Sequence, residues 1–381
     1  MSTHEQSDWD SREPSVLADQ RRAYDDMRDR CPVAHSEALG WSLFRHADVQ
    51  AVLSGPETYS NTSKHHAIPN AMDGPEHTRY RGLLEPYFAE ERMEAVEPQC
   101  REIAAEAALT LRDENAPDAI ASFAEIVALK TMCMFLGWPP ETWERVRTWL
   151  HGNQKASFDR DREAGAAMAD EYVAMVKDAN DANRRANVDP DNVTSRLMAT
   201  EVDGAHWTDE DIADTLRNWI AGHGTVVAAI GIVAFHLAED QRLQQELRDQ
   251  PGLVAAAIEE ILRVDGPLVA NRRTPTRDVT IGDRRIPAGE RISLMWIAAN
   301  RDEHAFTDAT SIRLDRDQEA NLAFGAGIHI CLGAPLARLE MRIAIEELLA
   351  HTTRISLEDT DTPVRDTYPS NGLTKLPLRI S

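Results

Sequence analysis

The chain has 381 residues, of which 42% are hydrophobic and 28% charged, and its formal net charge at pH 7 is -23. This length and apolar content predict a folded globular chain with a substantial core and exclude a disordered one. The strong acidity argues against nucleic acid or an anionic membrane as the main partner, because both would repel the protein. The polar N-terminus has no apolar core of the signal-peptide type. The chain also contains no uninterrupted apolar run of about 18 residues, so the sequence predicts no membrane-spanning helix. We therefore expect a cytoplasmic protein.

Hydrophobic periodicity predicts one domain over residues 1–381, with 1–15 as a flexible N-terminus. In chain order it predicts a helix at 16–30, short strands at Val33–His35 and Trp41–Phe44, and helices over most of 75–260, broken at Gly137–Pro140 and Asn187–Asp191. Short alternating runs then predict strands at Val279–Ile281, Ile286–Gly289 and Ile292–Trp296. A helix at 332–350 and a short β-like tail follow, so the sequence predicts a mainly α chain with a small β portion.

The longest predicted helix covers residues 209–239. Thr208 is its expected N-cap, and Asp211 stands at the third helical position to complete a capping box. Its middle, Trp219 to Phe235, is apolar on nearly all sides, which predicts a path through the core. Gly222 and Gly224 lie inside this stretch, and each costs about 1 kcal/mol relative to alanine. We therefore expect either a close approach to the backbone or a local opening of the helix there.

The four cysteines, Cys31, Cys100, Cys133 and Cys331, are widely spaced and form no Cys-x-x-Cys pair, a pattern that favours neither a disulfide scaffold nor a zinc site. Cys331 differs from the others because Gly325, Gly327 and Gly333 flank it, which allows tight turns and close approach of a flat ligand. The helix expected to begin at Cys331 would point its positive end at the sulfur and favour the thiolate. Such a thiolate suits a single axial bond to haem iron. A dinucleotide-binding loop or an inert buried cysteine is the alternative if the loop stands alone.

The run Phe324-Gly325-Ala326-Gly327-Ile328-His329-Ile330-Cys331-Leu332-Gly333 matches the cysteine signature of the cytochrome P450 family at every fixed position. The following residues, Ala334 to Glu340, also resemble the family's next helix. The resemblance implies a mainly α fold in which haem b lies between a long central helix and the helix after the cysteine loop. It implies Cys331 as the iron ligand and a monooxygenase that inserts one oxygen atom of O2 into a small organic substrate, by hydroxylation or oxidative dealkylation.

Further positions follow from the same resemblance. Glu260 and Arg263 match the family's Glu-x-x-Arg motif, and with Arg316 they are expected to brace the fold. The residues expected to bind the cofactor are His77, Arg81, Arg273 and His329, as donors to the haem propionates, together with Phe324 and Gly325 of the signature. The residues expected to line the substrate cavity are Ile68, Ala221, Leu268, Val269 and Asn271.

The oxygen-side helix departs from the family pattern. Ala221 to Thr225 reads Ala-Gly-His-Gly-Thr, so that Thr225 matches the threonine that assists O–O cleavage while Gly224 replaces the usual carboxylate. This puts the ordinary route of protons to dioxygen in doubt. His223 has two interpretations: a packed or ion-paired core histidine, which we favour, or a proton relay through water.

The chain contains no glycine-rich nucleotide loop after Cys331, so we expect electrons from a separate ferredoxin or flavodoxin with its reductase. Arg79, Arg338 and Arg342 are candidates for a basic docking face. The segment Glu259–Arg301 resembles haem domains of self-sufficient family members, without their fused reductase. A peroxide-driven peroxygenase and a non-catalytic haem sensor or carrier remain as alternative functions.

Overall fold

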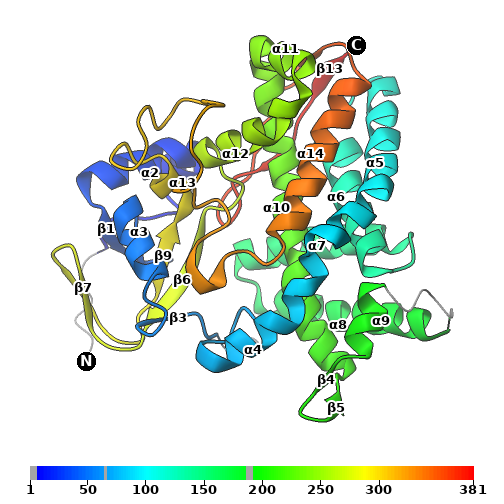
Figure 1. The fold of residues 1–381 in the computed structure, drawn as a ribbon. Coiled ribbons are helices and arrows are strands. Elements are labelled where there is room, and N and C mark those ends of the chain that lie inside the picture. Colours follow the sequence, from blue (N-terminus) through cyan, green and yellow to red (C-terminus); the bar gives the residue numbers. More distant parts are fainter. Residues whose placement is uncertain (1–6, 64–66, 186–191) are drawn as a thin grey trace.

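The computed structural model describes residues 7–63, 67–185 and 192–381, and it is mainly helical, with 57% helix and 12% strand. The helices form the larger part of the molecule and surround α10, while the main sheet lies to one side with α2, α3 and α13 (Figure 1). The helices of the described residues are α1 (Pro14–Ala18), α2 (Gln20–Arg30), α3 (His46–Leu53), α4 (Gly74–Leu84), α5 (Glu90–Asp113), α6 (Glu125–Leu136), α7 (Thr142–Asp159), α8 (Arg162–Arg185), α9 (Val193–Met198), α10 (Asp209–Glu239), α11 (Gln241–Asp249), α12 (Val254–Val264), α13 (Trp296–Asn300) and α14 (Ala334–Ala350). The expected mainly α fold with a small β portion is confirmed.

The main sheet has the strand order β1-β2-β9-β6-β3 among the described residues. Its strands are β1 (Val33–Ser36), β2 (Gly40–Leu43), β3 (Tyr59–Ser60), β6 (Ala270–Pro275) and β9 (Ile292–Met295). The small two-stranded sheets contain β4 (Glu201–Val202) with β5 (Ala205–His206), β7 (Val279–Ile281) with β8 (Arg284–Ile286), β10 (Ile355–Leu357) with β13 (Leu378–Ile380), and β11 (Val364–Arg365) with β12 (Leu373–Lys375). The strand expected at Ile286–Gly289 is wrong beyond Ile286, because Pro287 has no N–H to donate and Gly289 turns the chain at a φ of +81°.

Helix α10 has the predicted bounds and the predicted cap. The Thr208 hydroxyl accepts a hydrogen bond from the Asp211 N–H at 3.2 Å, and the Asp211 carboxylate accepts one from the Thr208 N–H at 2.8 Å. The helix continues without a break through Gly222 and Gly224, so the expected local opening is wrong. By length and composition alone α10 resembles a membrane span, but 61% of its most apolar window is buried inside the fold. It is the core helix of the molecule.

The ends of the chain pack more closely than expected. Of the N-terminal residues expected to be flexible, 1–6 lie outside the described residues, whereas Trp9 is buried against Tyr24 and Phe44. The Asp8 N–H also donates to the His35 carbonyl at 2.9 Å. The helix expected at 16–30 is divided into α1 and α2, since Asp19 is extended and caps α2 by accepting from the Arg22 N–H.

Two breaks between helices were expected from the sequence. The first is present, because α6 ends at Gly137, whose φ of +72° is left-handed and whose missing Cβ would lie 2.6 Å from the Asn192 side chain. The second, Asn187–Asp191, lies outside the described residues.

Glu260, Arg263 and Arg316 form one buried network. Arg263 donates to both carboxylate oxygens of Glu260 at 2.8 Å, and Arg316 donates to Oε1 at 2.7 Å. The remaining Arg263 N–H groups donate to the backbone carbonyls of Asn300 and Ala309, each at 2.7 Å. The network therefore ties α12 to the loop between α13 and the cysteine segment, as a brace would.

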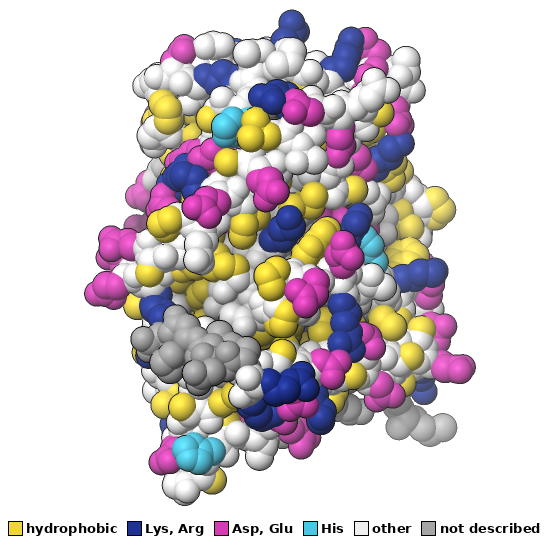
Figure 2. Space-filling view, turned by 90° about the vertical axis from the view of Figure 1, so that its right-hand side faces the viewer, with side chains coloured by type: hydrophobic (Ala, Val, Ile, Leu, Met, Phe, Trp, Pro, Cys, Tyr) yellow, Lys and Arg dark blue, Asp and Glu magenta, His cyan; other side chains and the backbone are white. Residues whose placement is uncertain are grey.

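The three arginines expected to form a basic docking face are all ion-paired. Arg79 contacts Asp203 at 2.7 Å, Arg338 contacts Glu259 at 2.6 Å, and Arg342 contacts Glu97 at 2.8 Å. Figure 2 shows basic and acidic side chains interspersed on one face of the molecule. Each guanidinium of the expected docking face therefore has a neighbouring carboxylate, and the docking face itself stays a prediction.

Candidate active site

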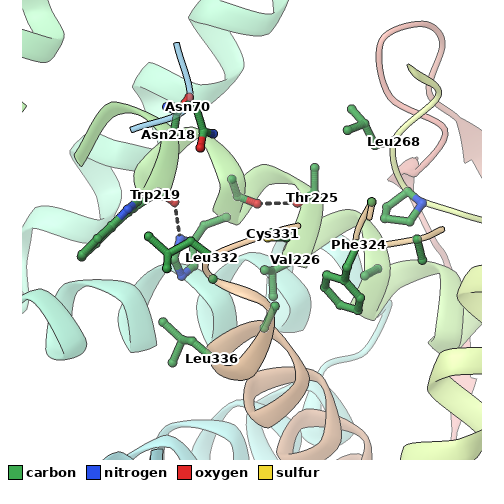
Figure 3. A pocket seen from close by; sticks show the side chains of 18 of the residues that line it. Asn70, Asn218, Trp219, Thr225, Val226, Leu268, Phe324, Cys331, Leu332 and Leu336 are labelled. Carbon is green, nitrogen blue, oxygen red and sulfur yellow. Dashed lines mark hydrogen bonds between the residues drawn. The ribbon is translucent and has the colours of Figure 1, made fainter. Parts of the chain in front are cut away.

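A cavity lies between α10 and the loop that leads into α14. Figure 3 shows Thr225 and Val226 of α10 on one side of it and Cys331, Leu332 and Leu336 on the other. Most of the wall is apolar, from α6, α10, α14 and the loops, and its members include Leu53, Ile68, Phe88, Met132, Phe135, Leu136, Trp219, Leu262, Leu268, Trp296, Phe324 and Ala337. A slot between two helices with a sulfur at one face suits a flat, largely apolar ligand.

The cysteine loop has its shape because of two glycines. Gly325 and Gly327 have φ values of +71° and +70°, a region that other residues rarely adopt. A Cβ on Gly327 would also lie only 2.6 Å from the Leu53 carbonyl oxygen of α3. The Cys331 N–H donates to the Phe324 carbonyl at 2.9 Å and closes the loop. Both glycines are thus required to place Cys331 in the cavity wall.

The helix expected to begin at Cys331 begins instead at Ala334, after a short turn, with Gly333 as its N-cap. The backbone N–H groups of Gly333 and Ala334 nevertheless lie toward the sulfur. Burial raises the pKa of the Cys331 thiol, whereas these two N–H groups and the guanidinium groups of Arg81 and Arg338 lower it. Because a coordinating thiol is deprotonated outright, these donors would stabilise the sulfur as a thiolate on a metal ion. No cluster of three or more His, Cys, Asp or Glu side chains that could hold a metal ion occurs in the described part of the chain.

A cluster of basic groups lies at one edge of the cavity. The rings of His77 and His329 stand 4.2 Å apart between centroids, although they belong to α4 and to the cysteine loop. Nε2 of His77 and Nδ1 of His329 are buried without a hydrogen-bond partner among the described residues, while Nε2 of His329 lies 3.4 Å from Oδ1 of Asp73. Burial lowers the pKa of Arg273 to about 10, against the opposing charge of Asp73. Unpartnered buried donors beside a buried guanidinium are costly unless an anion joins them.

The donors fit the two propionates of a haem. Arg273 lies on β6, and burial, His77 and Arg273 together lower the pKa of His329 to about 4. Arg81 lies nearer the cysteine, where its Nη1 donates to the Ile330 carbonyl at 2.7 Å and its Nε to Glu85 at 2.9 Å. Asp73 and Asn61 hold the cluster from outside, through His329 and Arg273 respectively. Carboxylates accept strong hydrogen bonds from such groups, so the residues present suit the cofactor.

The oxygen side of the cavity is formed by α10. The Thr225 hydroxyl donates to the Gly222 carbonyl at 2.6 Å, one turn earlier (Figure 3). Gly222 and Thr225 line the cavity, whereas Gly224 lies on the other side of the helix, in a separate pocket. A Cβ on Gly224 would touch only Leu150 of α7, at 3.9 Å. The absence of a carboxylate at Gly224 therefore has no steric reason.

His223 is buried and ion-paired. Its Nδ1 lies 2.7 Å from the Trp219 carbonyl, and its Nε2 lies 3.3 Å from Oε1 of Glu340, a buried residue of α14. The interpretation as an ion-paired core histidine thus has a definite partner, which the sequence analysis missed. The available signal was that Glu340 stands four residues after Leu336, on the face of α14 that is otherwise apolar.

The expected substrate residues do not all reach the cavity. Ile68, Leu268 and Asn271 line it. Val269 does not, because it is buried on the opposite side, in the small core that contains Trp9 and Tyr24. Ala221 packs against the main core and is not among the lining residues. The sequence analysis missed Asn70 and Asn218, two polar side chains of the cavity wall that Figure 3 shows close together.

Comparisons with known proteins agree with this architecture. The family model of cytochrome P450 matches residues 99–381. Cyclomarin C epoxidase CymV from Salinispora arenicola is 32% identical over 369 residues, which cover 91% of this chain and 92% of that protein. Erythromycin C-12 hydroxylase from Saccharopolyspora erythraea is 31% identical, with 89% and 88% of the two chains covered. The solved structure of open cytochrome P450 EryK from S. erythraea superposes with a TM-score of 0.87, at 27% identity, over 96% of this chain and 97% of that one.

The chain belongs to the cytochrome P450 family. It is a haem b-binding oxidoreductase of the monooxygenase class, as the hydroxylases and epoxidases among its relatives are, and it acts on small organic substrates.

Proposed function

We propose that the Cys331 thiolate would hold the haem iron and that Thr225 would assist O–O cleavage from α10. The observation that carries this assignment is that Cys331 and Thr225 line one largely apolar cavity, with the basic cluster of His77, Arg273 and His329 at its edge. The bound haem supplies dioxygen activation, and the thiolate ligand favours O–O cleavage. Thr225 and His223 then define the proton-handling side of the cavity, and Gly224, on the other face of α10, contributes no side chain to it.

The residues of this chain hold the cofactor and orient the substrate. His77, Arg273 and His329 bind the propionates, Arg81 closes the cysteine side, and Phe324 and Gly325 cover one face. The substrate is a small, mainly apolar organic molecule that packs against Ile68 and Leu268 and donates to or accepts from Asn271. The relatives named for cyclomarin C and erythromycin support oxygenation of such molecules, by hydroxylation or epoxidation.

Electrons come from a separate ferredoxin or flavodoxin with its reductase, in the cytoplasm. Because the arginines near the cysteine side are neutralised by carboxylates, docking depends less on long-range charge than in a complex steered by a basic patch. Association with the partner should therefore change little between low and moderate salt.

The assignment of Cys331 is tested by the spectrum of the reduced protein under carbon monoxide. We expect the red-shifted absorption band of a thiolate-ligated haem, and Cys331→Ala should abolish it. Cys133→Ala is the matched control, because Cys133 is buried in α6 away from the cavity and should leave the band unchanged. An unchanged spectrum in Cys331→Ala would contradict the assignment. Turnover with NADH and a surrogate ferredoxin system, compared with hydrogen peroxide alone, separates the monooxygenase from a peroxygenase.

A further inference from the structure

Two buried glutamates lie beside the middle of α10, each against a histidine. Glu340 of α14 contacts His223 at 3.3 Å inside the cofactor cavity. Glu125 of α6 contacts His151 at 2.6 Å in the separate pocket that Gly224 lines. Because Gly224 supplies no carboxylate, either glutamate is a potential source of protons for the oxygen side. Their surroundings distinguish them.

The contact between His223 and Glu340 contains one proton. A carbonyl oxygen only accepts, so Nδ1 of His223 must carry hydrogen to bond the Trp219 carbonyl at 2.7 Å. Nε2 then faces Oε1 of Glu340, and two lone pairs would repel each other. A single proton between these atoms satisfies both, as an imidazolium beside a carboxylate or as a neutral ring beside a carboxylic acid. The pair as a whole is then neutral, which burial favours.

Among the described residues, no hydrogen-bond donor other than His223 serves this carboxylate. Oε1 of Glu340 and Nε2 of His223 lie at an ion-pair distance of 3.3 Å, and neither these two atoms nor Oε2 of Glu340 has another partner there. Burial raises the pKa of Glu340, and the carboxylate and the Trp219 carbonyl raise the pKa of His223 against the effect of burial. The raised pKa of His223 means that the pair retains its proton beyond the pH at which an exposed histidine loses it.

The other helices that pack here bring few titratable groups. On α5, Cys100 faces Glu340, and burial, together with that carboxylate, raises the pKa of Cys100 to about 12. On α6, Met132 and Phe135 line the same part of the cavity. The charged residues Glu97 and Arg101 of α5 pair with the outer part of α14 instead. Of the titratable groups that pack around Glu340, the pair with His223 therefore holds the proton that is most readily transferred to the cavity.

Thr225 needs an external proton. Its hydroxyl hydrogen is committed to the Gly222 carbonyl, so its oxygen is left to accept a hydrogen bond from the cavity. Thr225, His223 and Glu340 all line this one cavity, which also contains the polar side chains Asn70 and Asn218. Water between these groups can connect the pair with the threonine without crossing the helix backbone.

Resting on the function proposed above, we propose that the His223–Glu340 pair is the proton donor of the oxygen side and replaces the carboxylate missing at Gly224. The proton between Nε2 and Oε1 passes to water in the cavity, and the water hydrogen-bonded to Oγ of Thr225 releases a proton toward dioxygen. The pair is left with a neutral ring and a carboxylate, and it regains one proton from solvent before the next turnover. Glu340 is thereby a positioning and proton-storing residue that touches neither haem iron nor substrate.

Glu125 does not serve this role. Arg147 contacts its Oε2 at 2.6 Å and His151 contacts its Oε1 at 2.6 Å, so each oxygen of this carboxylate has its own basic partner. The Glu125 pocket borders α10 at Gly224, Val227 and Ala228, a different face from that of Thr225. Glu125→Gln is therefore a matched control: another buried glutamate, also paired with a histidine, beside the same helix.

The test uses the haem-loaded protein without organic substrate, reduced by NADH through a surrogate ferredoxin system. NADH, dioxygen and hydrogen peroxide are measured together, because reduction of dioxygen to water requires more protons and electrons than reduction to peroxide. General acids contribute about 10²-fold or more, so the water-forming fraction should fall at least about tenfold in Glu340→Gln and stay unchanged in Glu125→Gln. In the wild type that fraction should decrease as the pH rises above neutrality, and this pH dependence should vanish in Glu340→Gln.

A purely structural pair gives a different result. Glu340→Gln would then lower the unfolding temperature while the folded enzyme kept the wild-type ratio of water to peroxide, and the proposal would be wrong. It would also be wrong if Glu125→Gln, rather than Glu340→Gln, abolished water formation, or if the wild type formed peroxide alone. The carbon monoxide spectrum separates these outcomes from a failure of the Cys331 assignment, because it should be normal in both glutamine variants.

Discussion

Glu260 and Glu340 are both buried glutamates on core helices, yet their partners differ. Glu260 accepts hydrogen bonds from Arg263, Arg316 and Gln318 and from the Arg313 N–H, at 2.7 to 3.1 Å. These donors hold the pKa of Glu260 below its usual value although burial opposes ionisation. Glu340 has His223 alone, and burial raises its pKa.

Burial alone therefore does not decide whether a glutamate braces the fold or transfers protons. A carboxylate whose oxygens are all satisfied by permanent cations is fixed in one charge state and braces the fold. A carboxylate that shares one proton with one histidine can lose that proton within an accessible pH range. The first arrangement suits structure and the second suits proton transfer.

Glu260→Ala should have the largest effect. It leaves Arg263 as an uncompensated buried charge, which costs roughly 3–5 kcal/mol. We expect little soluble haem-loaded protein, measured as yield and as the free energy of unfolding. Glu259→Ala, which removes the neighbouring carboxylate that pairs with the half-exposed Arg338, should cost at most about 1 kcal/mol. A Glu260→Ala protein that folds normally and loses only turnover would assign Glu260 to catalysis instead.

The next largest effect should be on the pH dependence of the free energy of unfolding, and it should come from Glu340 and not from Glu125. The unfolded chain loses its histidine proton near pH 6.5, whereas the raised pKa of His223 means that the folded pair keeps one. Above about pH 6.5 the folded state therefore binds more protons, and stability should fall by up to about 1.4 kcal/mol per pH unit until the pair itself deprotonates. Chemical unfolding at several pH values measures this slope. It should flatten in Glu340→Gln and persist in Glu125→Gln; a slope that persists in Glu340→Gln would place its origin elsewhere.

Gly224→Asp should have the smallest effect, on both stability and chemistry. Aspartate is a better helix residue than glycine by a few tenths of a kcal/mol, and its side chain meets only Leu150. The added carboxylate occupies the position the family normally uses, but Gly224 lines the pocket of Glu125 and not the cofactor cavity. Introduced into Glu340→Gln, it should therefore leave water formation from dioxygen as low as in Glu340→Gln alone. Restored water formation in the double variant would show that a carboxylate on this face of α10 reaches the oxygen side, and would contradict the separation of the two pockets.

Features that depend on contiguous residues could be predicted from the sequence. The cysteine loop is one run of ten residues that carries the family signature, and α10 carries its own cap and apolar stretch. The family and the bounds of α10 were therefore predicted correctly. Contacts between distant segments could not be predicted in the same way. His223 and Glu340 meet only because α10 and α14 pack against each other, and the neutralised arginines owe their partners to other helices.

The substrate residues give a second lesson of this kind. Leu268 and Val269 are neighbours in an extended segment, where successive side chains point to opposite sides. One of the two therefore had to lie away from the cavity, and the structure places Val269 in the core beside Trp9. Family position alone named both, whereas the alternation of extended backbone allows only one.

The most direct measurement of the shared proton is nitrogen NMR of the histidine side chains in reduced, carbon monoxide-bound protein labelled with ¹⁵N-histidine. His223 is assigned by the signal that His223→Gln removes. We predict that its Nδ1 stays protonated throughout, that Nε2 and Oε1 keep one proton to well above pH 6.5, and that Glu340→Met leaves a neutral ring at neutral pH. A His223 ring that titrates near pH 6.5 in both proteins would show that the two residues share no proton, and would contradict the assigned role of the pair.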